Sequence, residues 1–214
     1  MKLHLLLDYD GYLPTYAYIS EGKRHDVTIT RGVSLAPGFI VVIDRGYNEY
    51  KLFAHWTSNG IFFVTRLKEN VDYMVIEERA LPRNRNISAD QLIRFTGFYA
   101  QKHCLYLLRM VMVWDTGKDR EIVLLTNHLD FGATTISAIY KDRWQIELFF
   151  TALKQNLKVT TFVGTTENAL YIQIWTALIA MLLIEYLQFK SRFGWLISNL
   201  AGFLRWNLFT YSDL

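Results

Sequence analysis

The chain has 214 residues, of which 51% are hydrophobic and 15% aromatic, so it can bury a sizeable core and is not generally disordered. Its net charge of +3 is compatible with a nucleic-acid partner but does not require one. The single cysteine, Cys104, excludes an internal disulfide framework and a cysteine-based zinc site, and it indicates an intracellular protein.

The first third of the chain predicts strands joined by polar turns. Runs at residues 3–9 and 15–20 are typical of strands, and the unbroken run 39–44 ("FIVVID") is typical of a strand covered on both faces. Residues 48–60 have helical periodicity and end at a glycine suited to a C-cap, and residues 61–68 form another apolar strand. Strand, helix and strand at this spacing predict a crossover unit in an α/β sheet.

Later segments predict a β-rich insertion followed by helices. Short strand-like runs ("YMVIEE", "QLIRFTG", "YLLRMVMVWD", "REIVLLTN") are separated by polar turns. The pattern then predicts a long helix over residues 134–157, an extended segment over 158–164 and a helix over 166–190. We therefore expect a sheet-bearing first part, an insertion, two core helices and a helical tail, with bounds 1–68, 69–130, 131–190 and 191–214.

Residues 169–189 form the one segment of membrane length. Glu185 lies within it, and a carboxylate in mid-membrane is costly, so we favour a buried or docking helix. Asp8 and Asp10 interrupt the first apolar run, which predicts that it is not a signal peptide. We expect a cytoplasmic protein, with a membrane-associated helical protein as the alternative from another class.

Charged residues recur along one face of the expected long helix. At about 100° per residue, Tyr140, Arg143, Glu147 and Lys154 fall within a stripe about 60° wide. An adjacent apolar face is suited to docking on the sheet. The simplest interpretation is a solvated face with a weak helical ion pair between Arg143 and Glu147. The apolar face consists of Ile146, Phe149, Phe150, Leu153 and Leu157.

The spacing Tyr, two residues, Arg, three residues, Glu, six residues, Lys resembles the signature of the insertion-sequence transposases of the DDE class. Further segments resemble that family in the same order: "KLHLLLDYDGYLP", "GKRHDV", "VVIDRGYNEYKLF", "FFVTRLK", "LLTN", "RWQIELFF", "LKQNLKV" and "GTTENALYIQIW". The resemblance covers the chain from Lys2 to about Lys190. It implies a ribonuclease H-like fold, with a mixed α/β sheet, flanking helices and the β-rich insertion before the Glu147 helix.

The resemblance also implies chemistry. The family cuts and joins DNA by in-line displacement with two Mg²⁺ ions, for which Mn²⁺ is expected to substitute. Asp44 in "DRGY" corresponds to the second catalytic and metal-binding acid, and Glu147 to the third. Asp44 could instead cap the following turn, and Arg45 could be a plain surface charge. The implied partners are transposon-end and target DNA, bound by a homodimer at the nucleoid. The implied DNA contacts are Tyr140, Arg143, Lys154 and Arg45.

The first of the three catalytic acids, an Asp, is expected on a strand that precedes "KLHLLLDY" in the family. Asp8 and Asp10 align with a strand end instead, where Asp before Gly is ordinary turn chemistry. We therefore expect an N-terminally truncated chain that lacks the first central strand. The runs 3–9 and 39–44 would then pair directly, leave a gap or recruit a strand from another chain. The function expected is an incomplete transposase catalytic domain, or alternatively a catalytically inactive DNA-binding fragment.

Overall fold

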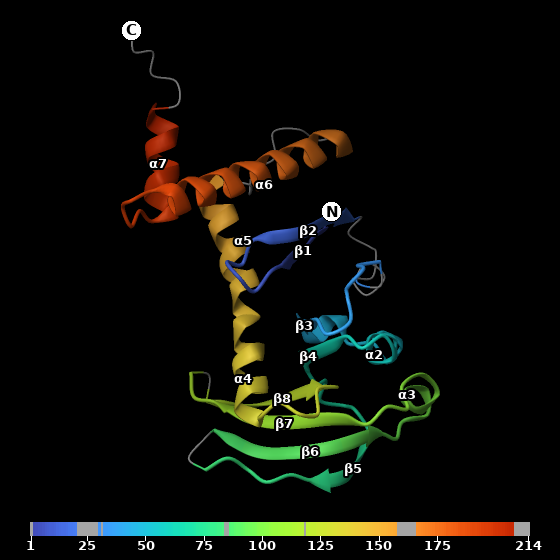
Figure 1. Ribbon diagram of the computed structural model, residues 1–214. Coiled ribbons are helices and arrows are strands. Elements are labelled where there is room, and N and C mark those ends of the chain that lie inside the picture. The colour runs from blue at the N-terminus through green and yellow to red at the C-terminus, as the bar shows by residue number, and fades with distance from the viewer. Residues whose placement is uncertain are drawn as a thin grey trace, which may run out of the picture. The chain divides into compact units, whose positions relative to one another are not determined.

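The computed structural model describes residues 2–20, 30, 32–83, 86–117, 119–157 and 166–207. The chain divides into two compact units, of which the smaller joins Met1–Ser20 to Trp144–Leu214 and the larger is Glu21–Arg143 (Figure 1). The expected extended segment 158–164 lies outside the described residues, as does the whole "GKRHDV" stretch.

A six-stranded mixed sheet organises the larger unit (Figure 1). Its first two strands are parallel and all the other neighbours are antiparallel. The four strands of the expected insertion thus continue the same sheet and do not form a separate one. In spatial order the strands are β3 (Ile40–Ile43), β4 (Phe62–Arg66), β8 (Arg120–Thr126), β7 (Leu108–Asp115), β6 (Ile87–Phe95) and β5 (Tyr73–Glu78).

The predicted crossover unit is confirmed. Helix α2 (Tyr50–Ser58) connects the parallel strands β3 and β4, and Gly60 follows it with φ +68°, a conformation that favours glycine. Phe53 of α2 stacks on Phe63 of β4, with 4.6 Å between ring centroids. The short helix α3 (Phe98–His103) contributes Ala100 to the same core.

Helix α4 (Ala133–Asp142) covers the opposite face of the sheet. Successive side chains of a strand point to opposite faces, so Phe63 packs in the α2 core while Val64 packs in the α4 core with Ile136. Helices on both faces of a mixed sheet give the mixed α/β architecture that the sequence predicted, consistent with a ribonuclease H-like fold.

In its described residues, the smaller unit combines a β-hairpin with three helices. Strands β1 (Lys2–Leu7) and β2 (Pro14–Ser20) pair antiparallel, and His4 is a packed strand residue whose Nε2 lies 2.9 Å from Ser20 Oγ. The apolar face predicted for residues 146–157 is confirmed at its centre, because Phe149 and Leu153 pack against Met181. The helices are α5 (Trp144–Leu157), α6 (Glu167–Lys190) and α7 (Ile197–Asn207).

Direct pairing between the strands that contain residues 3–9 and 39–44 is not found. Strand β1 pairs with β2 alone, and β3 pairs with β4 alone, among the strands that the structure describes. The outer edge of β3 therefore has no strand partner in the described residues. Its first residue, Ile40, is 37% exposed, so the strand is less covered than its apolar sequence predicts.

The prediction of one long helix over residues 134–157 is wrong. Helix α4 ends at Asp142 and α5 begins at Trp144, and Arg143 N–H donates to Tyr140 O, three residues earlier, at 3.1 Å. Such a tightened last turn satisfies a terminal carbonyl and ends the helix. The two helices also contribute to different cores, so Tyr140 belongs to α4 in the larger unit, whereas Glu147 and Lys154 belong to α5 in the smaller unit.

Helix α6 is the one helix in the described part of the chain that is long and apolar enough to cross a membrane. Ile174, Leu178 and Met181 lie on its inner face and are buried in the core of the smaller unit. Glu185 lies near this face, and burial raises the pKa of its carboxyl above the ordinary value. The N-cap is Thr166, whose hydroxyl accepts from Ala169 N–H, so the start expected near residue 166 is confirmed.

Candidate active site at the ends of β3 and β4

Parallel strands end at the same edge of a sheet, and β3 and β4 bring polar residues together there. Asp44 directly follows β3 and Arg66 is the last residue of β4. Asp44 caps a short 3₁₀ turn (Arg45–Tyr47), in which its Oδ1 accepts from Gly46 N–H at 2.9 Å. The capping role that the sequence allowed for Asp44 is therefore present, and it uses one carboxylate oxygen.

The other carboxylate oxygen of Asp44 faces α4. Its Oδ2 lies 3.6 Å from Nη1 of Arg143, and the Arg143 guanidinium lies 5.8 Å from the centre of the Tyr140 ring. Burial raises the pKa of the Tyr140 hydroxyl, while the charge of Arg143 opposes that rise. Three residues proposed for the site from sequence, Asp44, Tyr140 and Arg143, thus lie together within the larger unit.

The side chain of Asn48, in the segment that follows β3, is hydrogen-bonded to the last two residues of β4. Its Nδ2 donates to Arg66 O at 2.7 Å, and its Oδ1 accepts from the buried hydroxyl of Thr65, also at 2.7 Å. Its own N–H closes the 3₁₀ turn on Arg45 O. The amide side chain of Asn48 therefore links the turn that follows Asp44 to the end of β4.

The strand ends carry more positive than negative side chains. Arg45 and Arg66 both face Glu69, at 3.6 Å and 3.8 Å, and Glu69 is largely exposed. Long ion pairs at an exposed carboxylate contribute little to stability and are screened by salt. With Arg143, three guanidinium groups surround two carboxylates, an electrostatic setting that favours a phosphate anion.

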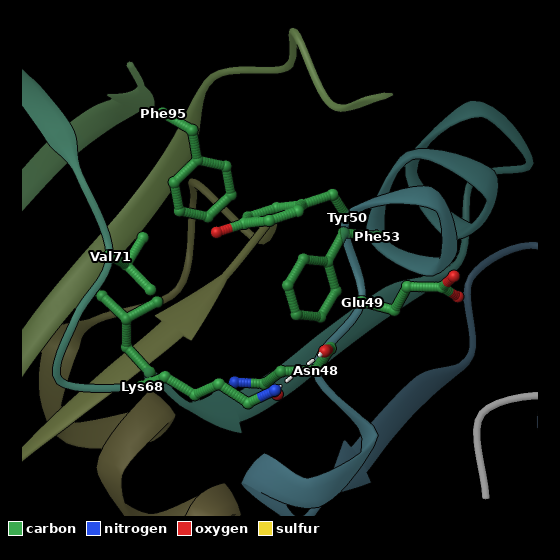
Figure 2. A pocket seen from close by; sticks show the side chains of 8 residues that line it. Asn48, Glu49, Tyr50, Phe53, Lys68, Val71 and Phe95 are labelled. Atoms are coloured by element: carbon green, nitrogen blue, oxygen red, sulfur yellow. Dashed lines mark hydrogen bonds between the residues drawn. The ribbon is translucent and has the colours of Figure 1, made fainter. Parts of the chain in front are cut away.

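A small pocket lies beside this cluster, at the start of α2 (Figure 2). Tyr50 meets Phe95 edge to face, with 5.0 Å between ring centroids, and burial raises the pKa of its hydroxyl. Lys68 Nζ donates to Asn48 O at 3.3 Å. None of the site residues proposed from sequence lines this pocket, whose lining is Asn48, Glu49, Tyr50, Phe53, Leu67, Lys68, Val71 and Phe95.

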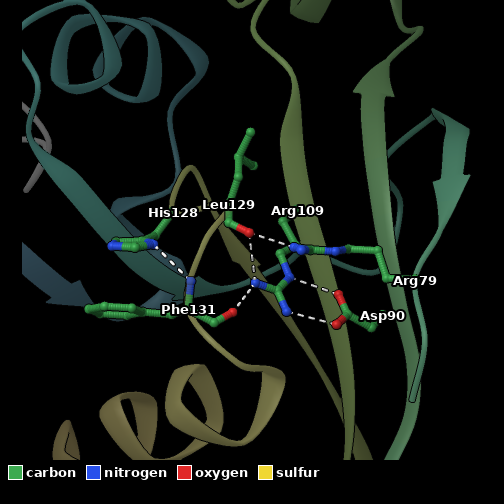
Figure 3. A network of polar contacts seen from close by, with 6 residues as sticks. All are labelled: Arg79, Asp90, Arg109, His128, Leu129 and Phe131. Atoms are coloured by element: carbon green, nitrogen blue, oxygen red, sulfur yellow. Dashed lines mark hydrogen bonds and ion pairs between the residues drawn. The ribbon is translucent and has the colours of Figure 1, made fainter. Parts of the chain in front are cut away.

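A buried ion pair anchors the loop that leads into α4 (Figure 3). Arg109 Nε and Nη2 each donate to Asp90 at 2.7 Å, and Arg109 Nη1 donates to the carbonyls of Leu129 and Phe131. Arg79 donates to the same Leu129 carbonyl at 2.5 Å. The insertion strands β6 and β7 thus fix the loop from which α4, with Tyr140, begins.

Glu147 and Lys154 belong to the smaller unit. Both lie on α5, Glu147 in its first turn and Lys154 in its last, which are the ends where their charges suit the helix dipole. Glu147 O accepts from the hydroxyl of Thr151 at 2.8 Å, and Lys154 is exposed. Their proposed roles in catalysis and DNA binding stay predictions.

Within the described residues, no three His, Cys, Asp or Glu side chains gather as a group that could hold a metal. Asp44 has one oxygen in the turn and the other beside a guanidinium, and Glu69 is shared by two arginines. Mg²⁺ prefers several converging oxygen ligands. The described part of the larger unit therefore does not by itself fit a magnesium site.

Residues 1–183 match the family described as a transposase DDE domain. The chain belongs to this family. The match begins in the smaller unit, runs through the larger one and ends in α6. The predicted resemblance to insertion-sequence transposases of the DDE class is therefore confirmed.

Curated relatives of this DDE domain support the assignment. It is 32% identical over 189 residues to a putative transposase y4zB of Sinorhizobium fredii, covering 86% of this chain and 52% of the relative. It is 31% identical over 193 residues to a probable transposase for insertion sequence element IS5377 of Geobacillus stearothermophilus, covering 90% and 50%. A putative transposase for insertion sequence element IS4SA of Synechocystis is 44% identical over 158 residues, covering 72% and 43%. The chain thus spans about half the length of these relatives.

Sequence reasoning missed Asn48, Arg66 and the Asp90–Arg109 pair. Arg66 is the last residue of an apolar strand, and Asp44 directly follows another. This shared position could have predicted that the two side chains lie at the same edge of the sheet. Asp90 and Arg109 lie inside strands, and only their antiparallel pairing through β6 and β7 brings them together. No local pattern marks that pair.

Proposed function

We propose that this DDE domain acts in Mg²⁺-dependent cleavage and joining of DNA strands by in-line displacement at phosphorus. The observation that carries the proposal is Asp44, directly after the parallel strand β3, beside Tyr140 of α4 and Arg143 at the end of that helix. A carboxylate on a rigid strand next to phosphate-binding cations suits phosphodiester chemistry. Glu147 is the second proposed acid. The proposed DNA contacts are Tyr140, Arg143, Lys154 and Arg45.

The proposed substrate is DNA because the guanidinium groups of Arg45, Arg66 and Arg143 gather at the ends of β3 and β4, where they are suited to phosphate. Contacts from arginine to phosphate position a duplex without selecting its sequence. The proposed substrates are therefore transposon-end and target DNA, without a particular sequence. We propose that a homodimer binds them at the nucleoid. The family's chemistry uses divalent metal, and the acids assigned to it here are Asp44 and Glu147.

A second candidate function is DNA binding without cleavage. The engagement of both Asp44 oxygens, one by Gly46 N–H and the other facing Arg143, favours it. So does the excess of guanidinium groups over carboxylates at the strand ends. Binding of this kind depends on release of counterions and weakens steeply as salt increases.

One set of assays on the full chain distinguishes the two candidate functions. Labelled duplex DNA is incubated with Mg²⁺, and strand nicking and joining are measured beside binding at several salt concentrations. Catalysis predicts products that are lost in Asp44→Asn and in Glu147→Gln but retained in Asp115→Asn, a control at the β7–β8 turn. Salt-sensitive binding without products supports the second candidate, and a chain that neither binds nor cuts DNA overturns both.

A further inference from the structure

The Asp44–Arg143 pair joins two groups to which the proposed function assigns different ligands. Arg143 is the proposed contact for a DNA phosphate, whereas Asp44 is a proposed acid. In the structure they face each other, with Asp44 Oδ2 3.6 Å from Arg143 Nη1. The guanidinium also lies near the Tyr140 ring, so its approach to Asp44 is supported from α4.

A carboxylate and a phosphate present the same chemistry to a guanidinium. Both are anions whose oxygens accept charge-assisted hydrogen bonds, often two at once. Donors of Arg143 directed at Asp44 are not simultaneously available to DNA. We propose that Asp44 is an internal competitor for the DNA phosphate at Arg143, so that phosphate binding there requires the Asp44–Arg143 pair to open. This inference rests on the proposed DNA-binding function.

The competition is expected to be strongest at this pair. The side chains of Arg143 and Arg66 are about equally buried, at 18% and 19% exposed, but the Asp44 side chain is 51% exposed. Solvent therefore screens the Asp44–Arg143 pair less than it screens the pairs of a more exposed carboxylate. Glu69 could compete in the same way for Arg45 and Arg66 over similar distances, but its side chain is 78% exposed. Exposed pairs of that kind contribute little.

The size of the effect follows from linkage. Whatever free energy favours the pair must be given up when phosphate replaces Asp44, and the two interactions are reciprocally coupled. For a partly exposed pair, this predicts a gain in metal-free DNA affinity of about two- to fivefold when the carboxylate is removed. Asn retains an oxygen that can still accept from Gly46 N–H, so Asp44→Asn keeps the turn.

The decisive experiment measures DNA affinity by fluorescence anisotropy in EDTA, with a labelled duplex of random sequence. Asp115→Asn is the matched control, because Asp115 Oδ1 likewise accepts from a glycine N–H two residues later, at 3.1 Å. Both variants remove one negative charge, but only Asp44→Asn removes the carboxylate that faces Arg143. Asp44→Asn is expected to bind DNA about two- to fivefold more tightly than Asp115→Asn does.

A double-mutant cycle with Arg143→Gln tests the pair itself. The Arg143 substitution should cost more DNA affinity in the Asp44→Asn background than in the unmodified chain. The dependence of affinity on salt should steepen by about one phosphate contact in Asp44→Asn. Equal affinities of the two Asp variants, or equal costs of Arg143→Gln in both backgrounds, overturn the inference. Absence of any DNA binding by the unmodified chain instead overturns the proposed function.

Discussion

Arg109 and Asp90 are joined by two hydrogen bonds of 2.7 Å, and both side chains are almost fully buried between β6 and β7. Replacing Asp90 by Ala leaves a buried guanidinium without its counter-ion. Such a loss costs about 3–5 kcal/mol in the free energy of unfolding. Urea denaturation of the full chain measures the change.

A suitable control for Asp90→Ala is the exposed Asp130. Asp130→Ala is expected to stay within about 0.5 kcal/mol of the unmodified chain. Replacing both partners, with Asp90→Leu and Arg109→Met, should recover only part of the loss, because the carbonyls of Leu129 and Phe131 still lose their donor. Equal effects of Asp90→Ala and Asp130→Ala would contradict the assigned role of the pair.

Asn48→Asp is expected to destabilise the larger unit by about 1–3 kcal/mol. The substitution keeps the shape but replaces the Nδ2 donor by an acceptor that faces Arg66 O, formerly 2.7 Å from the amide. Asn59→Asp is the matched control, because Asn59 Nδ2 also donates to a carbonyl at 2.7 Å, that of His55, but at an exposed position where water can replace it. If both variants shift the urea midpoint equally, Asn48 does not fasten the strand ends.

The parts of the fold that the sequence predicted are those with local patterns. The crossover from β3 through α2 to β4 follows from two apolar runs that flank a helix ending at Gly60, and Asp44 follows from its position after the first run. The end of α4 at Asp142 had no such pattern. It depends on which apolar residues pack in which core: Ile136 packs with the sheet, whereas Phe149 packs with the hairpin and α6.

Stability of the larger unit is expected to fall as pH decreases through the ordinary pKa of histidine. His128 stacks on Phe131, with 3.7 Å between ring centroids, and its Nδ1 accepts from Phe131 N–H. Burial lowers the pKa of His128 below the usual value of 6.5. Because the folded form disfavours the proton, its contribution is full above that usual pKa and is lost on acidification.

His128→Asn tests this expectation, because an amide oxygen can accept from Phe131 N–H without titrating. Between about pH 7.5 and about pH 5, the variant should lose less free energy of unfolding than the unmodified chain. The exposed His55 provides the control, and His55→Asn should retain the full loss. A loss that is as large in His128→Asn as in His55→Asn would show that another group titrates.

In the smaller unit, Glu185→Gln is expected to raise stability at neutral and alkaline pH. One carboxylate oxygen of Glu185 is buried and has no hydrogen-bond partner among the described residues, and burial raises the pKa of the carboxyl above 4.5. An acid with a raised folded pKa favours folding below its ordinary pKa and loses that contribution as pH rises through the raised value. Thermal unfolding should therefore show a variant that is more stable than the unmodified chain near about pH 8, with the difference shrinking toward about pH 4.5. Glu167→Gln, at the exposed start of α6, should show no such growth with pH, and a Glu185 difference that does not change with pH would contradict the assignment.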